Sequence, residues 1–157
     1  MIADAPSQDQ EDIDLGLLNE VLGFRLRRIQ NHLARGFTER LTRPDVKPGV
    51  FSALALIEAN PGLSQTALAS EIGFDKATVV AIVDALERLG WAERGQHKVD
   101  RRRSALTITP LGRESLSELH DICLANEAPV YAALSKTERA DLFRLLDKVY
   151  GACFSDR

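Results

Sequence analysis

Two short helical segments separated by only three residues, GFD, dominate the middle of the 157-residue chain. Ser64 is a favourable N-cap for QTALASEI, and Gly73 suits a left-handed turn beyond the end of that segment. Asp75 caps the second segment, KATVVAIVDALERL, which Gly90 closes and whose apolar residues recur with a 3.6-residue period. Because a small residue such as Ala69 lets two helices cross closely, this stretch predicts a helix-turn-helix.

The flanking segments are predicted from apolar periodicity and from helix-breaking residues. Apolar residues at three- and four-residue steps predict one long helix over residues 15–41, which TRPDVKPG ends. VFSALALIEA predicts a core helix that NPG ends. After the central pair, the sequence predicts a strand WAER, a loop over residues 95–102 and a strand RSALTIT. A helix is then predicted from Thr109-Pro110 to about Asn126. After Pro129, a last helix is predicted from a Ser135–Glu138 capping box to about Val149.

Three consecutive arginines, residues 101–103, stand where the predicted loop meets the second predicted strand, in a chain whose formal net charge is −3. A charge run alone is more typical of a solvated surface, and two short helices alone also fit an ordinary helical hairpin. The combination favours another interpretation, because a helix fits a major groove and an extended arginine fits the narrower minor groove beside it. The sequence therefore predicts a mainly α fold with a small β-hairpin wing, a winged helix-turn-helix.

The negative charge of the chain is concentrated at its start. The first twenty residues contain six acids and no base, so the net charge of −3 leaves +3 for the remainder. With 45% hydrophobic and 27% charged residues, the composition is that of a folded globular protein. Residues 1–14 are expected to be a flexible acidic tail and not a secretory signal, and no apolar run reaches bilayer length, so a cytoplasmic location is expected.

No arrangement of residues in the sequence predicts catalysis. There is no glycine-rich phosphate loop, no ordered Ser-His-Asp set and no metal-ligand cluster, so we expect no enzyme, cofactor or metal site. Cys123 and Cys153 are too few for a disulfide framework. A regulator that responds to oxidants through one of these cysteines is an alternative function, and a winged helix used for protein contacts is another.

Residues 15–150 resemble the MarR family of bacterial transcriptional regulators. The resemblance is carried by LSQTALASEIGFDKATVVAIVDALERLGWAER, DRRR and LTITPLG. It implies a homodimer with intertwined terminal helices, whose two winged lobes bind a pseudo-palindromic operator in double-stranded DNA, with repression as the expected outcome. In the implied organisation, one continuous domain contains a helical dimerisation region of residues 15–45 and 110–153 and a DNA-binding region of residues 46–109.

The resemblance also implies which residues contact DNA. Asp100 is expected to orient an arginine of the wing, while Arg101 and Arg102 enter or flank the minor groove. Lys76 and Thr78 are expected to hold phosphates at the start of the recognition helix. The full implied set is Ser64, Gln65, Thr66, Lys76, Ala77, Thr78, Val80, Ala81, Lys98, Asp100, Arg101, Arg102 and Arg103.

Two positions of the recognition helix depart from the family pattern. Many members carry polar or basic residues where this chain has Val80 and Ala81. Apolar side chains can contact thymine methyl groups but supply no hydrogen-bond code. We therefore expect more of the sequence specificity to come from the wing and from DNA shape.

Proteins of this family usually release DNA when a small anionic molecule binds between the dimerisation helices and the DNA-binding lobe. Arg25, Arg28 and His32 share one face of the first predicted helix at three- and four-residue spacing. Together with Phe51 they form the predicted effector site, for an aromatic acid or its coenzyme A thioester. A solvated face, or salt bridges to the acidic tail or the partner chain, is the alternative for these cations.

Overall fold

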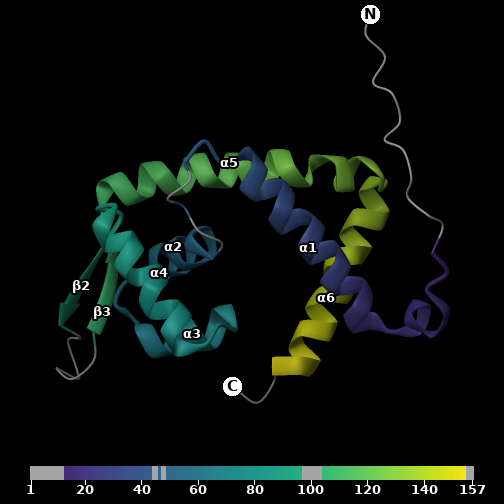
Figure 1. Ribbon diagram of the computed structural model, residues 1–157, viewed down its shortest axis with the longest axis horizontal. Helices are drawn as coiled ribbons and strands as arrows, with labels where there is room; N and C mark the ends of the chain where they lie inside the picture. The colour runs from purple at the N-terminus through teal and green to yellow at the C-terminus, as the bar shows by residue number, and fades with distance from the viewer. Residues whose placement is uncertain (1–12, 44–45, 47–48, 97–103, 155–157) are drawn as a thin grey trace, which may run out of the picture. The chain divides into compact units, whose positions relative to one another are not determined.

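The computed structural model describes residues 13–43, 46, 49–96 and 104–154. The chain forms two compact units, Met1–His32 and Leu33–Arg157. In chain order the elements are a 3₁₀ helix Gly16–Glu20, α1 Leu22–Arg40, α2 Val50–Ala59, β1 Leu63–Ser64, α3 Gln65–Ile72, α4 Lys76–Arg88, β2 Ala92–Gln96, β3 Ser104–Ile108, α5 Pro110–Ala132 and α6 Lys136–Phe154 (Figure 1). This mainly helical chain with one small antiparallel sheet confirms the predicted fold class.

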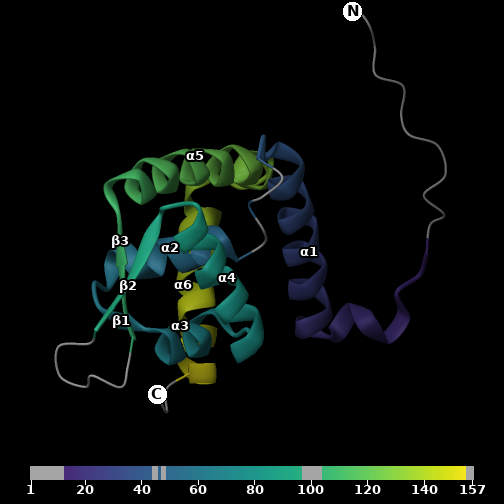
Figure 2. The same ribbon diagram turned by 60° about the vertical axis from the view of Figure 1, so that its left-hand side comes forward.

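The sheet has the strand order β1-β3-β2, with both pairs antiparallel (Figure 2). The β2–β3 register runs from Ala92 opposite Ile108 to Gln96 opposite Ser104, so Gly95 and Gln96 extend a strand where a loop was predicted. A third strand was not predicted, because two residues are too few to show an alternating pattern. By pairing with β3, β1 ties the wing to the residue that caps α3.

The hydrophobic core of the Leu33–Arg157 unit lies among α2, α3, α4 and the sheet, with α5 running above α2 (Figure 1). The predicted apolar stripe of α4 points into it, and β3 contributes Leu106 and Ile108. The largest fully buried side chains are Trp91, Leu54, Ile57, Leu68, Leu86, Leu106, Val50, Val79 and Val83. This core positions the exposed face of α4 and the base of the wing.

The prediction of one continuous helix over residues 15–41 was wrong. The backbone N–H of Gly16 donates to Asp14 Oδ1, and Gly16 has a positive φ of 50°. A 3₁₀ helix begins at this residue. Val21 then has extended backbone angles, and α1 begins at Leu22. No residue of the 3₁₀ helix is buried, so packing within the single chain does not fix the break before α1.

The prediction that the fifth helix ends near Asn126 was also wrong, because α5 continues through Pro129 to Ala132. A proline removes one backbone hydrogen bond, but contacts on both sides of it hold this helix together. Asn126 is buried and donates through Nδ2 to the Leu33 carbonyl at 2.8 Å. Beyond the proline, Tyr131 Oη donates to Glu127 Oε2 at 2.8 Å.

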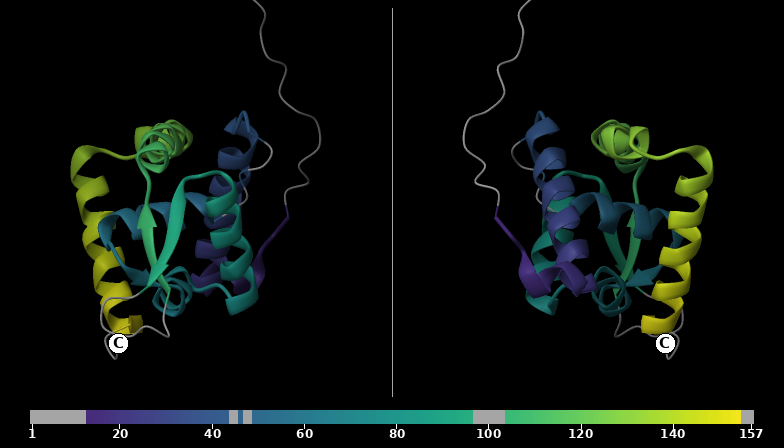
Figure 3. Two further views of the ribbon diagram at one scale, coloured as in Figure 1. Left: turned by 90° about the vertical axis from the view of Figure 1, so that its left-hand side faces the viewer. Right: turned by 90° about the vertical axis from the view of Figure 1, so that its right-hand side faces the viewer.

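The last helix begins with the predicted capping box and is longer than predicted. The backbone N–H of Ser135 donates to Glu138 Oε2 at 2.8 Å, and that of Glu138 donates to Ser135 Oγ at 3.3 Å. Helix α6 turns back from the end of α5 and has no buried residue (Figure 3). Its exposed large apolar side chains are Leu142, Phe143, Leu145, Leu146, Val149, Tyr150 and Phe154.

Candidate nucleic-acid interface

Helix α4 has an inner and an outer face of different chemistry. Its buried residues are Val79, Ile82, Val83, Ala85 and Leu86. Its predicted DNA contacts are all exposed, namely Lys76, Ala77, Thr78, Val80 and Ala81. The fold therefore gathers these predicted residues on one accessible surface, while their contact with DNA stays a prediction.

Asp75 caps α4 as predicted. Its Oδ1 accepts the backbone N–H of Thr78 at 2.9 Å, and its Oδ2 accepts the Thr78 hydroxyl at 2.6 Å. The side-chain and backbone hydrogen bonds of Thr78 lower the pKa of Asp75 from its ordinary value of 3.8. The Thr78 hydroxyl hydrogen is engaged by the cap, so donating it to a phosphate would require that bond to break.

Removing this cap should destabilise the protein in a pH-dependent way. Because the folded pKa of Asp75 is lowered, the ionised cap stabilises the fold above the ordinary pKa of 3.8 and loses that effect as the pH falls through the lowered value. Asp75→Ala should therefore lower the midpoint of urea unfolding at neutral pH. The difference between the midpoints of wild type and variant should become smaller on acidification. Asp121→Ala, which removes an exposed carboxylate from α5, is the control. A gap for Asp75→Ala that does not change with pH would contradict the capping role.

The start of α3 is held in a similar way. Ser64 Oγ accepts the backbone N–H of Ala67 at 3.2 Å, which confirms its predicted capping role. Ser64 and Gln65 are half-buried and Thr66 is exposed. At the other end, Gly73 adopts the left-handed conformation with φ 75°, and its N–H donates to the Ala69 carbonyl at 3.1 Å. The turn between the two helices has the predicted chemistry.

Arg94 joins the base of the wing to α4, a link that was not predicted from the sequence. Its Nη2 donates to Asp84 Oδ1 at 2.6 Å, and its Nη1 forms an ion pair with Glu87. The backbone N–H of Arg94 also donates to Glu87 Oε1 at 3.2 Å. Charged pairs between a strand and the preceding helix leave no periodic signal, so only the structure reveals this link.

The predicted wing residues Lys98, Asp100, Arg101, Arg102 and Arg103 lie outside the described residues.

The other end of the wing is joined to α5 through Thr109. The Thr109 hydroxyl donates to the Gly90 carbonyl at 2.6 Å and accepts the N–H of Gly112 at 2.9 Å. The Thr109 N–H donates to the Trp91 carbonyl at 3.0 Å. Helix α5 therefore starts in direct contact with the segment that links α4 to β2.

The predicted effector residues fall in both compact units. Arg25, Arg28 and His32 are exposed on α1 in the Met1–His32 unit. There the Arg25 Nε donates to the Asn19 carbonyl at 2.8 Å, and the Arg28 guanidinium lies 5.9 Å from the Phe24 ring centroid. Phe51 belongs to the Leu33–Arg157 unit, so a site formed by all four residues stays a prediction.

Phe51 lines a cavity of about 410 Å³ between α2 and α5. Its ring centroid lies 6.4 Å from that of His120 and 6.0 Å from that of Phe37. The other lining residues are Ala55, Glu58, Ala59, Arg113, Leu116 and Ser117. Neither Arg113, which stands alone among neutral and acidic residues, nor His120 was predicted as a site residue from the sequence.

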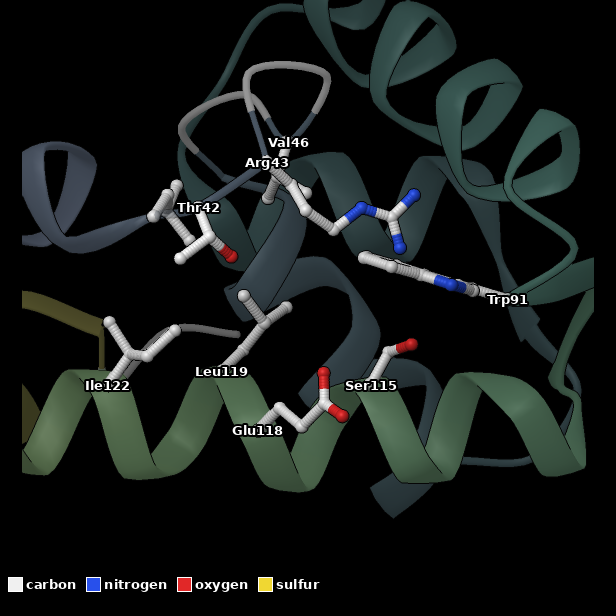
Figure 4. Close-up of a pocket in the computed structure, with 9 residues that line it drawn as sticks. Thr42, Arg43, Val46, Trp91, Ser115, Glu118, Leu119 and Ile122 are labelled. Atoms are coloured by element: carbon white, nitrogen blue, oxygen red, sulfur yellow. The ribbon is translucent and has the colours of Figure 1, made fainter.

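A second cavity, of about 30 Å³, lies beside Trp91 (Figure 4). The Arg43 guanidinium lies 5.1 Å from the Trp91 ring centroid, and Ser115, Glu118 and Leu119 of α5 face them. A space of this size admits water but no aromatic ring. It therefore does not compete with the larger cavity as an effector site.

The surroundings of Cys123 do not favour a reactive thiol. Burial, and then the neighbouring Glu127 carboxylate, raise the pKa of Cys123, so the less reactive protonated thiol is favoured. Cys153 is exposed near the end of α6.

In the part of the chain that the structure describes, no cluster of three or more His, Cys, Asp or Glu residues is arranged to hold a metal ion. None of the helices described is both long enough and apolar enough to cross a membrane.

Comparison with known sequences links this geometry to a family. A model of the MarR family matches residues 45–103. The chain is 35% identical over 145 residues to the "Putative transcriptional regulatory protein for hcr operon" of Thauera aromatica, covering 92% of this chain and 87% of that protein. It is 30% identical over 137 residues to the transcriptional repressor MprA of Escherichia coli (strain K12), covering 83% and 76% respectively.

Comparison with solved structures gives the same result. The transcriptional repressor CouR, bound to a 23-mer DNA duplex, matches with a TM-score of 0.75 and 31% sequence identity, over 89% of this chain and 99% of CouR. CouR bound to p-coumaroyl-CoA matches with a TM-score of 0.71 and 29% identity, over 88% and 98% respectively. Both the fold and the sequence of this chain are thus similar to those of a repressor solved with DNA and with a ligand.

Proposed function

The chain belongs to the MarR family of transcriptional regulators, and from that premise we propose that it represses transcription by binding a pseudo-palindromic operator as a homodimer. The observation that carries the proposal is the exposed face of α4. Asp75 caps the N-terminus of this helix, and the ion pair between Arg94 and Asp84 connects the helix to the base of the wing. A helix N-terminus with Lys76 suits a phosphate, and the exposed helix suits a major groove.

The second part of this proposal is the dimer, in which residues 15–45 and 110–153 form the dimerisation region. Seven large apolar side chains of α6 are at least 38% exposed in the single chain. Contiguous apolar surface of this kind is typical of protein interfaces. A second copy of the chain would cover it and would place the two α4 helices in successive major grooves, about 34 Å apart.

The third part is release from DNA by a small anionic effector, an aromatic acid or its coenzyme A thioester. The cavity of about 410 Å³ beside Phe51 has the volume of a small-molecule site. The similarity to CouR, solved with p-coumaroyl-CoA, supports a ligand of this class. Arg25 and Arg28 are exposed cations that suit the phosphates of a thioester, and His32 is exposed on the same helix.

The double variant Arg101→Ala/Arg102→Ala tests the DNA-binding proposal. Footprinting on the DNA adjoining the protein's own gene would first identify the operator. The variant should then fail to retard that duplex at physiological salt. The slope of log affinity against log salt should also fall by about one for each arginine that no longer neutralises a phosphate. Thermal unfolding and a dimeric elution volume should match wild type.

Normal retardation by this variant would contradict the role of the wing. A wild-type protein that elutes as a monomer and binds no duplex would contradict the whole proposal. Arg144→Ala, which removes an exposed arginine of α6 that pairs with Asp141 at 3.1 Å, controls for the loss of charge once its elution volume is shown to be dimeric.

A further inference from the structure

Tyr150, near the end of α6, contacts the helix-turn-helix. Its hydroxyl donates to Glu71 Oε1 on α3 at 2.6 Å, and the last turns of α6 lie at the level of α3 (Figure 1). The Tyr150 ring is held from its own helix by Phe154, whose ring centroid lies 4.5 Å away. Hydrogen bonds from a hydroxyl to a carboxylate are short and are among the stronger ones in proteins. Helix α6 is therefore joined to α3 by a directional contact.

Glu71 lies close to the start of the recognition helix. It belongs to the last turn of α3, which ends at Ile72. Gly73 then makes the left-handed turn, and Asp75 caps α4. Because so short a turn joins the two helices, a contact that holds the end of α3 also holds the start of α4, the part proposed to bind phosphates.

The segments that follow α1 and precede α5 both contact Trp91, at the opposite end of α4. The Arg43 guanidinium lies 5.1 Å from the Trp91 ring centroid, and the Thr109 N–H donates to the Trp91 carbonyl at 3.0 Å. The 13 residues of α4 lie between Glu71 and Trp91, and a helix of that length spans about 20 Å. A body held at one place can rotate about it, so a contact at the far end of α4 restricts the orientation of that helix.

We infer that Tyr150 is a positioning residue that determines which spacing between operator half-sites the dimer accepts. Its bond to Glu71 fixes the orientation of α3 and α4 relative to α6, which belongs to the proposed dimerisation region. A two-fold axis relates the two copies, so fixing this orientation in each copy fixes the separation of the two α4 helices. The inference rests on the proposed function, because it concerns a dimer that binds two half-sites.

The bond can be removed without leaving a buried polar group. Tyr150 is 51% exposed in the single chain, and Glu71 is exposed as well. Loss of a hydrogen bond costs most where it leaves a buried donor or acceptor unsatisfied, which is not the case here. Tyr150→Phe should therefore change the orientation of α3 and α4 without unfolding the protein.

Retardation assays with the full-length protein and the operator identified by footprinting test the inference. One base pair added or removed between the half-sites displaces one half-site by about 3.4 Å and rotates it by about 35°. Wild type should bind the native spacing best. In Tyr150→Phe and in Glu71→Ala, the ratio of the affinities for native and altered spacing should fall about three-fold or more, as expected for one lost hydrogen bond. The double variant Tyr150→Phe/Glu71→Ala should show no further fall, because both changes remove the same bond.

Tyr131→Phe is the matched control, because Tyr131 is the other of the two tyrosines and donates to Glu127 within α5 at 2.8 Å. It should keep the wild-type ratio. Glu71→Gln, whose amide oxygen can still accept from the Tyr150 hydroxyl, should keep most of the spacing preference. Glu71→Ala lies outside the proposed dimerisation region, so it tests the bond independently of any effect of Tyr150→Phe on dimerisation.

An unchanged spacing ratio in Tyr150→Phe and Glu71→Ala would overturn the inference. An equal loss of affinity at every spacing would also overturn it, because a contact that merely stabilises the fold would give that result. A wild-type protein that retards no operator duplex would contradict the proposed function instead. Normal retardation by wild type, with the same ratio in Glu71→Ala, would contradict this inference alone.

Discussion

Gly112→Ala should destabilise the protein strongly, although it adds a single methyl group. A Cβ at this position would lie 2.0 Å from the Trp91 carbonyl oxygen and 2.8 Å from Ile108 Cγ1. The first of these is a backbone atom, so relief requires the start of α5 to move away from the segment linking α4 to β2. We expect a loss of about 3 kcal/mol in the free energy of unfolding, the upper part of the usual range for overpacking. Denaturation with urea would measure it.

Gly95→Ala is the matched control for this prediction. Gly95 is exposed within β2, outside the proposed dimerisation region, and a Cβ there would lie 3.8 Å from the Ala105 carbonyl oxygen, an ordinary contact. Because glycine is unfavourable inside a strand relative to alanine, this variant should be unchanged or stabilised by up to about 1 kcal/mol. Equal unfolding midpoints for Gly112→Ala and wild type would show that α5 does not pack against Trp91 as described.

Leu86→Ala should cost about 2–5 kcal/mol of unfolding free energy, as expected for truncating a fully buried leucine. Leu86 is completely buried on the inner face of α4. Val80, six residues earlier on the outer face of the same helix, is 44% exposed, so Val80→Ala should change the free energy of unfolding by less than about 0.5 kcal/mol. Urea unfolding of both variants would measure the contrast. Similar losses in the two variants would contradict the assignment of the faces.

The same pair of variants separates folding from DNA recognition. Val80→Ala should fold normally and shift the preference among operator sequences if Val80 contacts thymine methyl groups, as the sequence predicts. Retardation assays with operators that differ at single thymines would detect this shift. An unchanged preference would assign the specificity to other residues.

Local signals in the sequence predicted the helix-turn-helix well. Caps and turns such as Ser64, Gly73 and Asp75 act on backbone groups within three or four residues, so their chemistry can be recognised directly from the sequence. The predicted bounds of α2 and α3 match the structure. The stripe of α4 was predicted correctly because amphipathic periodicity is also a local property.

The features that were missed depend on residues distant in the sequence. Strand β1 exists because Leu63 pairs with Leu106, and two residues have no strand pattern of their own. Helix α5 continues beyond Asn126, whose side chain binds the Leu33 carbonyl.

The candidate site shows the same limit. Arg113 is oriented by Glu58, which is 55 residues earlier in the chain, so neither residue drew notice in the sequence. The predicted residues of α1 could be grouped from the sequence because they follow a helical spacing, and their role in an effector site stays a prediction.

The Arg94 link between the wing and α4 has a consequence for operator design. Asp84 and Glu87 hold Arg94, at the base of the wing, against α4. If helix and wing both contact DNA as proposed, these ion pairs would fix the distance between the major-groove bases and the neighbouring minor groove within each half-site. Inserting one base pair inside a half-site should therefore be far more damaging than changing the identity of a base that neither element contacts.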